Sequence, residues 1–227
     1  MSNETKGSIH LLFGYDFKYE FNDLSIHSIK ELQKLTNYNL DGVSGNHTFR
    51  FGINKDLYEY GKVSLSLGYN LRKINASSYE YILINLDSLP IDGEFKHNLN
   101  LSISSINFLA EYKYDIMGTS GIGITMGLEM PIASNGQYFQ EMTKPEDRGY
   151  FTDTGTRIRN NQTLNDTQIN STSISSDLFI YRDFPMDADF NNYLQFRLGI
   201  GYNLNNFSAY NNWSIFSIKM SILFHVN

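Results

Sequence analysis

The sequence predicts an all-β fold: an eight-stranded, antiparallel, up-and-down transmembrane β-barrel. Three observations lead to this fold class. Eight segments alternate apolar and polar residues with a period of two, their connections alternate between short and long, and the polar face of several strands consists of glycine and serine. Membrane barrels of this kind have short turns at one end and long loops at the other. We expect residues 1–227 to form this barrel as a single domain.

The first segment, GSIHLLFGYDFKYEF, shows the alternation most clearly. Apolar residues occupy every odd position from Ile9 to Phe21, and mostly polar residues lie between them. Globular strands average roughly five or six residues. Tilted strands that cross lipid need about nine to eleven. The length of this segment therefore favours a membrane-crossing strand.

Seven further segments continue the pattern. The eight predicted strands are 9–21, 47–54, 62–72, 98–114, 121–130, 173–184, 193–204 and 215–226. In 98–114 the apolar phase changes after Ile103, which predicts a β-bulge near Ser104 and Ser105. Residues 173–184 are rich in β-forming residues but alternate poorly.

The connections divide into two classes by length. The short ones are 55–61, 115–120 and 184–190, and the long ones are 22–46, 73–97, 131–172 and 205–212. With eight strands, both chain ends are expected on the short-turn side. Ile26, Ile29, Leu32 and Leu35 have helical spacing, which predicts a short helix in the first long loop. The polar third loop is expected to extend above the barrel, partly as a β-hairpin.

Composition excludes several classes of protein. The net charge is −6, with both signs spread along the chain, so a general nucleic-acid binder is not expected. The absence of cysteine excludes disulfides, thiol catalysis and cysteine-ligated metals. No run of eighteen apolar residues predicts a transmembrane helix, and no cleavable signal precedes the first strand pattern.

Alternation alone does not show which face of the sheet points outward, so a soluble eight-stranded barrel of lipocalin type, or a sandwich, remains the alternative. The small residues of the polar face suit the crowded inside of a narrow barrel better than a hydrated surface. Tyrosines on the apolar face fit an interfacial girdle. The predicted girdle is Tyr15, Tyr19, Tyr69, Tyr112, Tyr114 and Tyr202.

The predicted lumen face carries charged residues that are costly to bury singly and should therefore pair. They are His10, Asp16, Lys18, Glu20, Arg50, Arg72, Glu111, Lys113, Glu129, Arg182, Arg197, Lys219 and His225. A salt-bridge network that plugs the lumen is the simplest interpretation. The alternative is the gate of a small pore, since eight strands leave little room for a wide channel.

An outer-membrane enzyme is a third alternative, because some small barrels carry a serine nucleophile beside a histidine. His10 and His225 fall on the first and last strands, and His47 and His97 fall near the outer ends of two others, with Ser44 near one of them. None of these positions makes a recognisable nucleophile, base and acid motif. We therefore predict no catalytic residue, no metal site and no cofactor.

The segment IDGEFKHNLNLSISSINFLAEYKY, followed by KPEDRGYFTDTGTRIRNNQ and a β-rich stretch, resembles the outer-membrane β-barrel domain family of Gram-negative bacteria. The resemblance is greatest to barrels that precede OmpA-type peptidoglycan-binding domains in Bacteroidetes- and Chlorobi-like lineages, and it covers about residues 8 to 226. No peptidoglycan-binding domain is present in this sequence, so anchoring to the cell wall is not implied. The chain ends in ILFHVN, whereas many such barrels end on an aromatic residue.

Together these observations predict an integral protein of the cell outer membrane with a structural or interaction role, a charge-plugged lumen and long outer loops. It is expected to contact the lipid bilayer and lipopolysaccharide, with other envelope proteins as candidate partners and no nucleic acid. A small gated pore is the main alternative, and a lipid-modifying enzyme is less favoured.

Overall fold

The computed structural model describes residues 8–25, 39–57, 60–86, 89–146, 150–151, 153–164, 172–188, 191–204 and 213–227. Its strands are β1 (Ile9–Ser25), β2 (Asn39–Asp56), β3 (Gly61–Leu86), β4 (Leu89–Asp115), β5 (Ser120–Lys144), β6 (Ile158–Leu164), β7 (Ser173–Pro185), β8 (Tyr193–Asn203) and β9 (Trp213–Val226). None of the described segments forms a helix with the length and hydropathy of a membrane span.

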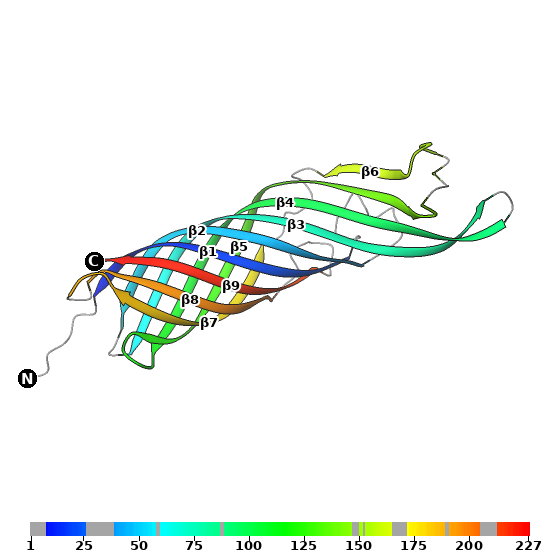
Figure 1. Ribbon diagram of the computed structural model, residues 1–227. Coiled ribbons are helices and arrows are strands. Elements are labelled where there is room, and N and C mark those ends of the chain that lie inside the picture. The colour runs from blue at the N-terminus through cyan, green and yellow to red at the C-terminus, as the bar shows by residue number, and fades with distance from the viewer. Residues whose placement is uncertain are drawn as a thin grey trace, which may run out of the picture.

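Eight of these strands close into a ring. The order is β1-β2-β3-β4-β5-β7-β8-β9, and β9 pairs back onto β1 (Figure 1). Every pairing in the ring is antiparallel. Among the described strands, β6 pairs only with the outer part of β5, between Gly136 and Glu141. The predicted eight-stranded antiparallel barrel is confirmed.

The ends of the barrel differ as the sequence predicts. Short turns connect β2 to β3, β4 to β5 and β7 to β8, and the start of β1 and the end of β9 lie at this end (Figure 1). At the other end, 73–97 is not a loop, because β3 and β4 remain paired as far as Leu86 and Leu89. β1 and β2 also extend into 22–46, and the hairpin predicted in the third long loop is present as β5 and β6. The predicted helix and the 205–212 connection lie outside the described residues.

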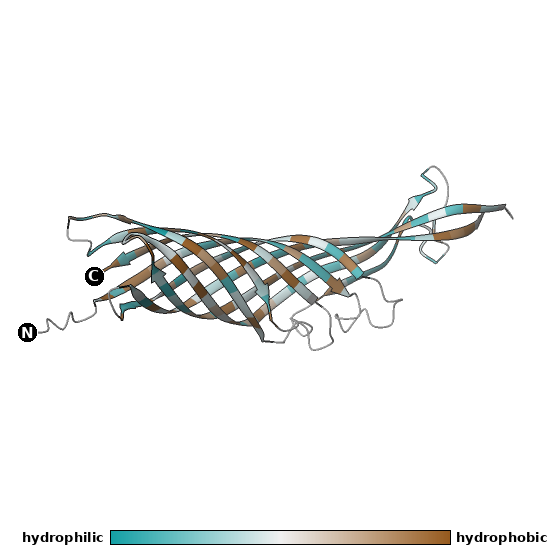
Figure 2. Cartoon of the chain, turned by 90° about the horizontal axis from the view of Figure 1, so that it is seen from below, coloured by the Kyte–Doolittle hydropathy of each residue, from teal (hydrophilic) through white to brown (hydrophobic). Residues whose placement is uncertain are grey.

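The apolar residues change from the outward face of the sheet to its inward face as the strands leave the barrel. On β3 the outward residues Tyr69 and Leu71 are followed by Lys73, and on β1 Phe21 is followed by Asp23. Directly beyond the apolar band the outward face of these two strands is therefore polar, and on β3 outward apolar residues return only farther out, from Tyr79 to Leu83. Figure 2 shows hydrophobic and hydrophilic residues alternating along the strands of the barrel. Beyond the end of the band, the inward face becomes apolar. This is the arrangement expected where a barrel leaves lipid and enters water.

The β-bulge predicted near Ser104 and Ser105 is confirmed in position, as a register shift between β4 and β5, but it does not turn β4 over. The pairing of β4 with β3 is continuous from Leu89 to Tyr114, and the odd residues from Phe95 to Asp115 stay inward throughout. The inserted residue of this bulge is Ile132 on β5, not a residue of β4. The apolar phase of β4 changes because the lumen itself changes from polar to apolar, not because the strand turns over.

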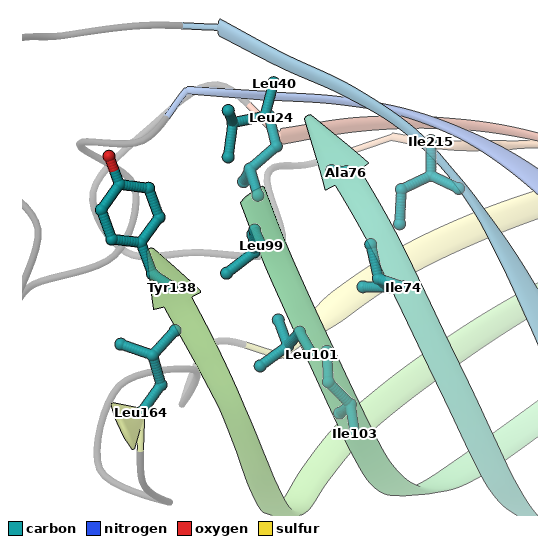
Figure 3. Packing of buried hydrophobic residues seen from close by; sticks show 10 residues of the cluster. All are labelled: Leu24, Leu40, Ile74, Ala76, Leu99, Leu101, Ile103, Tyr138, Leu164 and Ile215. Atoms are coloured by element: carbon teal, nitrogen blue, oxygen red, sulfur yellow. The ribbon is translucent and has the colours of Figure 1, made fainter. Parts of the chain in front are cut away.

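The inward apolar residues pack together at the outer end of the lumen (Figure 3). We call this cluster the outer cap. It contains Leu24, Leu40, Ile74, Ala76, Leu99, Leu101, Ile103, Tyr138, Leu164 and Ile215. These residues come from seven strands, six of the ring and β6, so the cap packs strands from opposite sides of the barrel against one another at its outer end.

Beyond the cap, the outer parts of β3, β4 and β5 continue with β6 as a projecting sheet (Figure 1). Its inner face has a small core of Phe95, Met142 and Phe151, and Ile82 and Ile84 pack against it. The Arg159 guanidinium lies 4.2 Å from the centre of the Phe151 ring. The outer sheet is therefore a packed element rather than a set of independent loops.

The cap gives a direct stability test. Leu99 is fully buried in the cap, whereas Leu71 points outward with 40% of its surface exposed. We expect Leu99→Ala to lower the unfolding free energy by about 2–5 kcal/mol, because it removes buried contacts and leaves a cavity. Leu71→Ala is the matched control and should cost clearly less, because lipid chains can fill the space. Urea unfolding of the barrel in vesicles measures both, and equal losses would contradict the cap.

Candidate functional site

The lumen collects most of the charged residues that the sequence predicts for it. Apart from Arg182, every predicted lumen charge points inward in the structure, and nearly all are buried. They form three layers along the barrel axis with the outer cap above them. The layers are described from the cap towards the short-turn end.

The layer nearest the cap is centred on Arg72 of β3. Its guanidinium forms two hydrogen bonds with Glu20, at 2.7 and 3.0 Å, and two with Glu129, at 3.2 and 3.1 Å. A planar guanidinium suits such bidentate pairing. Neutral side chains donate further hydrogen bonds to the two carboxylates. Ser44 and Asn46 donate to Glu20, and Asn70 and Ser105 donate to Glu129. Both carboxylates are therefore fully engaged.

The middle layer is a continuous chain of alternating charges. Its order is Lys18, Asp177, Lys219, Asp16, Arg50, Glu111 and Arg197. Successive charged atoms in this chain lie no more than 3.5 Å apart. The residues come from β1, β2, β4, β7, β8 and β9, so the layer spans the barrel from side to side.

The third layer lies near the short turns. Lys62 sits between Asp115, at 3.1 Å, and Asp183, at 3.4 Å. The Tyr181 hydroxyl donates a hydrogen bond to Asp115. His225 stacks on Tyr193 with ring centres 4.3 Å apart.

Lys113 departs from this pattern of pairing. Its side chain is fully buried, and its ammonium group has no hydrogen-bond partner among the described residues. Both ring nitrogens of His225 also lack a hydrogen-bond partner among the described residues. Lys113 is thus the inward lysine with the least compensated charge in this part of the structure.

Little free volume remains between these layers. A void bounded by Asp16, Lys18, Glu129 and Lys219 measures about 10 Å³. A volume of roughly 10–15 Å³ holds about one water molecule. In this part of the lumen the layered charges therefore leave room for about one water molecule.

Arg182 was predicted for the lumen, and this is wrong. It is exposed on the outer face, with its guanidinium 5.5 Å from the centre of the Phe184 ring. The inward positions of β7 include Phe179 and Tyr181, so apolar rings enter the lumen and disturb the alternation of this strand. Gly123 makes room for the Phe179 ring, because a Cβ there would lie 2.3 Å from it.

Sequence reasoning missed several lumen charges. Asp177 and Asp183 were hidden by the poor alternation of β7, although both lie in one phase of that strand. Lys62 and Asp115 were overlooked because they stand at strand ends beside the short turns. The outer cap was also missed. The apolar phase change in β4 was its signal, but it was interpreted as a bulge.

The predicted girdle tyrosines all lie on the outward face. Tyr19, Tyr69 and Tyr202 each lie two residues before the residue that ends the outward apolar band at that point: Phe21, Leu71 and Leu204. Tyr112 and Tyr114 lie at the other end of the apolar band, next to the β4–β5 turn. Tyr15 lies between these levels, and its hydroxyl is 2.6 Å from Nδ1 of His47.

The histidines do not assemble with the nearby serine. Ser44 donates to Glu20, while His47 points outward beside Tyr15. His97 lies in the outer sheet, 2.8 Å from the Tyr138 hydroxyl and 3.3 Å from Glu80. Burial lowers the pKa of the His97 imidazole, although Glu80 opposes the shift. Among the described residues no three His, Asp or Glu side chains group as a metal site.

Comparisons with known proteins give structural likeness only. No family model and no curated protein matches the chain. Among solved structures, Neisserial surface protein A is 12% identical with a TM-score of 0.41, and the alignment covers 94% of this chain and 95% of that one. Ail of Yersinia pestis is 11% identical with a TM-score of 0.39, covering 97% and 99%. The hydrocarbon channel CymD is 9% identical with a TM-score of 0.36, covering 96% and 88%.

The structure itself defines the class of protein. A closed ring with an outward apolar band, a polar lumen, short turns at one end and long extensions at the other is an integral outer-membrane β-barrel. The short-turn end is then the periplasmic end, and the outer sheet lies on the cell surface.

The layer around Arg72 yields a second prediction. Arg72→Met leaves Glu20 and Glu129 buried without their cation, and breaking a buried pair in this way costs about 3–5 kcal/mol. We therefore expect a large fall in the urea midpoint of the folded barrel. Adding Glu20→Gln and Glu129→Gln should restore much of the loss, because the uncompensated charges are removed.

Arg182→Met is the matched control, since this arginine is exposed outside the lumen. It should change the unfolding free energy by no more than about 0.5 kcal/mol. If Arg72→Met is as mild as Arg182→Met, the lumen charges do not hold the barrel together.

Proposed function

We propose that this protein is a sealed outer-membrane scaffold that presents a rigid surface element to other molecules. The observation that supports this best is the filled lumen. Three layers of paired charges and an apolar cap occupy the path that a solute would take. Neither the geometry of the histidines nor the unpaired Lys113 suggests catalysis, so we propose a role that is not enzymatic.

The outer sheet supports the interaction part of the proposal. Its own small core and the ion pair of Lys144 with Glu94, at 3.0 Å, make it a packed platform. Hydrogen bonds from Thr143 and Lys144 lower the pKa of the Glu94 carboxyl. Tyr81 and Leu83 each expose 73% of their surface on its outward face. Exposed apolar groups of this kind are typical of interaction sites, and other envelope proteins are the proposed partners.

The proposal includes two further points. The barrel is proposed to contact lipopolysaccharide through the outward residues of its upper rim. It is also proposed to be related to the barrels that precede OmpA-type peptidoglycan-binding domains, on the strength of the segments quoted above for that resemblance.

Conductance in planar bilayers tests the sealed lumen against the small gated pore. Purified, refolded protein should add no unitary conductance steps at neutral pH, because on this proposal the three layers and the cap close the water path through the barrel. Protein unfolded by heat before addition serves as the control for leakage. Reproducible steps from the folded protein alone would overturn the scaffold and favour the pore.

A further inference from the structure

A row of exposed polar side chains crosses the outward face directly above the apolar band. Asn75 on β3 pairs in register with Asn100 on β4, Asn100 with Gln137 on β5, and Gln137 with Thr163 on β6. All four side chains are exposed. Residues directly opposite in antiparallel strands have Cβ atoms about 4.5–5.5 Å apart. The row therefore presents closely spaced donors and acceptors on one surface.

A second row runs beside the first, one outward position nearer the lipid. Lys73 on β3 pairs with Ser102 on β4, and Ser102 pairs with Asn135 on β5. Both rows line one shallow groove of about 400 Å³. We call this surface the rim groove. Its polar groups are amides, hydroxyls and a single ammonium group.

Most of these groups are free to bind a ligand. Within the described part of the chain, the side chains of Lys73, Asn75, Asn100, Ser102 and Asn135 make no hydrogen bond or ion pair. Gln137 donates to Asn161 at 2.7 Å, which leaves its own carbonyl oxygen available. An exposed set of unpaired amides satisfies its hydrogen bonds with water or with a ligand rich in hydroxyl groups.

The position of the rim groove indicates which ligand it meets. The row of Asn75 continues through Val43 to Phe21, and the row of Lys73 continues through Gly45 to Tyr19. These rows pass from the apolar band into the groove. Lys73 and Asn75 follow Leu71, the residue that ends the apolar band on β3, by about 7 and 13 Å along the strand at ~3.3 Å per residue. The groove therefore lies at the level of lipid headgroups.

We propose that the rim groove binds the phosphorylated saccharide of lipopolysaccharide in the outer leaflet. Acyl chains of the same molecule would lie on outward apolar residues below the groove, such as Leu71 and Ile106. The amides would hydrogen-bond sugar hydroxyls, and Lys73 would pair with a phosphate. This inference rests on the proposed contact of the barrel with lipopolysaccharide, and it places that contact on the outward face of β3 to β6.

The charges on the neighbouring strands β1 and β2 also favour binding over β3, β4 and β5. At the same rim, β1 and β2 carry the exposed pair Asp23 and Asp41, directly opposite each other. These carboxylates disfavour a phosphate beside them. A phosphorylated headgroup is therefore favoured over β3, β4 and β5, where Lys73 lies.

Calorimetric titration of the detergent-solubilised protein tests the assignment. The ligands are purified lipopolysaccharide with a phosphorylated core, its dephosphorylated form, and phosphatidylcholine. The variant with Asn100→Ala and Gln137→Ala should bind both forms of lipopolysaccharide about tenfold more weakly, because roughly two hydrogen bonds to sugar are lost. Lys73→Met should abolish the preference for the phosphorylated form and leave binding of the dephosphorylated form unchanged.

Two substitutions provide matched controls. Asn39→Ala removes an exposed amide on β2, and Lys96→Met removes an outward lysine on β4, both away from the rim groove. Both should bind as the wild type does. If the wild type binds lipopolysaccharide no better than phosphatidylcholine, the proposed contact and the rim groove both fail. If the wild type prefers lipopolysaccharide and the double alanine variant binds within about twofold of it, the contact exists and only the rim groove is overturned.

Discussion

Lipid offers no hydrogen bonds to a backbone, and this constraint decides the rest of the structure. A sheet in lipid must close so that no strand edge is left unpaired, which β9 achieves by pairing with β1. Closure with eight strands leaves an interior just wide enough for side chains. Charges placed in that interior are costly unless they pair, and most of them find a partner across the lumen. The alternating chain from Lys18 to Arg197 is the result, and it links six strands of the barrel across its interior.

The same constraint explains the outer end. Above the bilayer the outward face meets water, so apolar residues gain by moving inward. Leu71 and Lys73 on β3 mark the change outside, and Ile74 and Ala76 mark it inside. The strands do not need to stop at the membrane surface, because their pairing is as stable in water once an inner core is available. The outer cap and the core around Phe95 supply that core, so the sheet projects where loops were expected.

The sequence allowed the ring of strands, the short turns and most of the inward charges to be predicted, because alternation with period two reports a boundary between two environments. Prediction from the sequence failed where the apolar face of the sheet changes from the outside of the barrel to the inside. The phase change after Ile103 was attributed to an inserted residue in β4. A period-two pattern changes phase in the same way whether the strand gains a residue or the lumen changes from polar to apolar. Arg182 was misplaced for a related reason: Phe179 and Tyr181 bring rings into the lumen, where polar residues were expected. Partners across the barrel, such as Arg72 between Glu20 and Glu129, depend on closure and could not be deduced from spacing.

The most direct measurement is the level at which the outward face leaves the lipid. The chain has no cysteine, so single substitutions can be labelled without interference. Leu71→Cys, Lys73→Cys, Phe21→Cys and Asp23→Cys would each be placed in nanodiscs and treated with a water-soluble maleimide. We predict rapid labelling at positions 73 and 23 and protection at positions 71 and 21 until the barrel is unfolded. Equal labelling rates within each pair would contradict the membrane boundary on which this account depends.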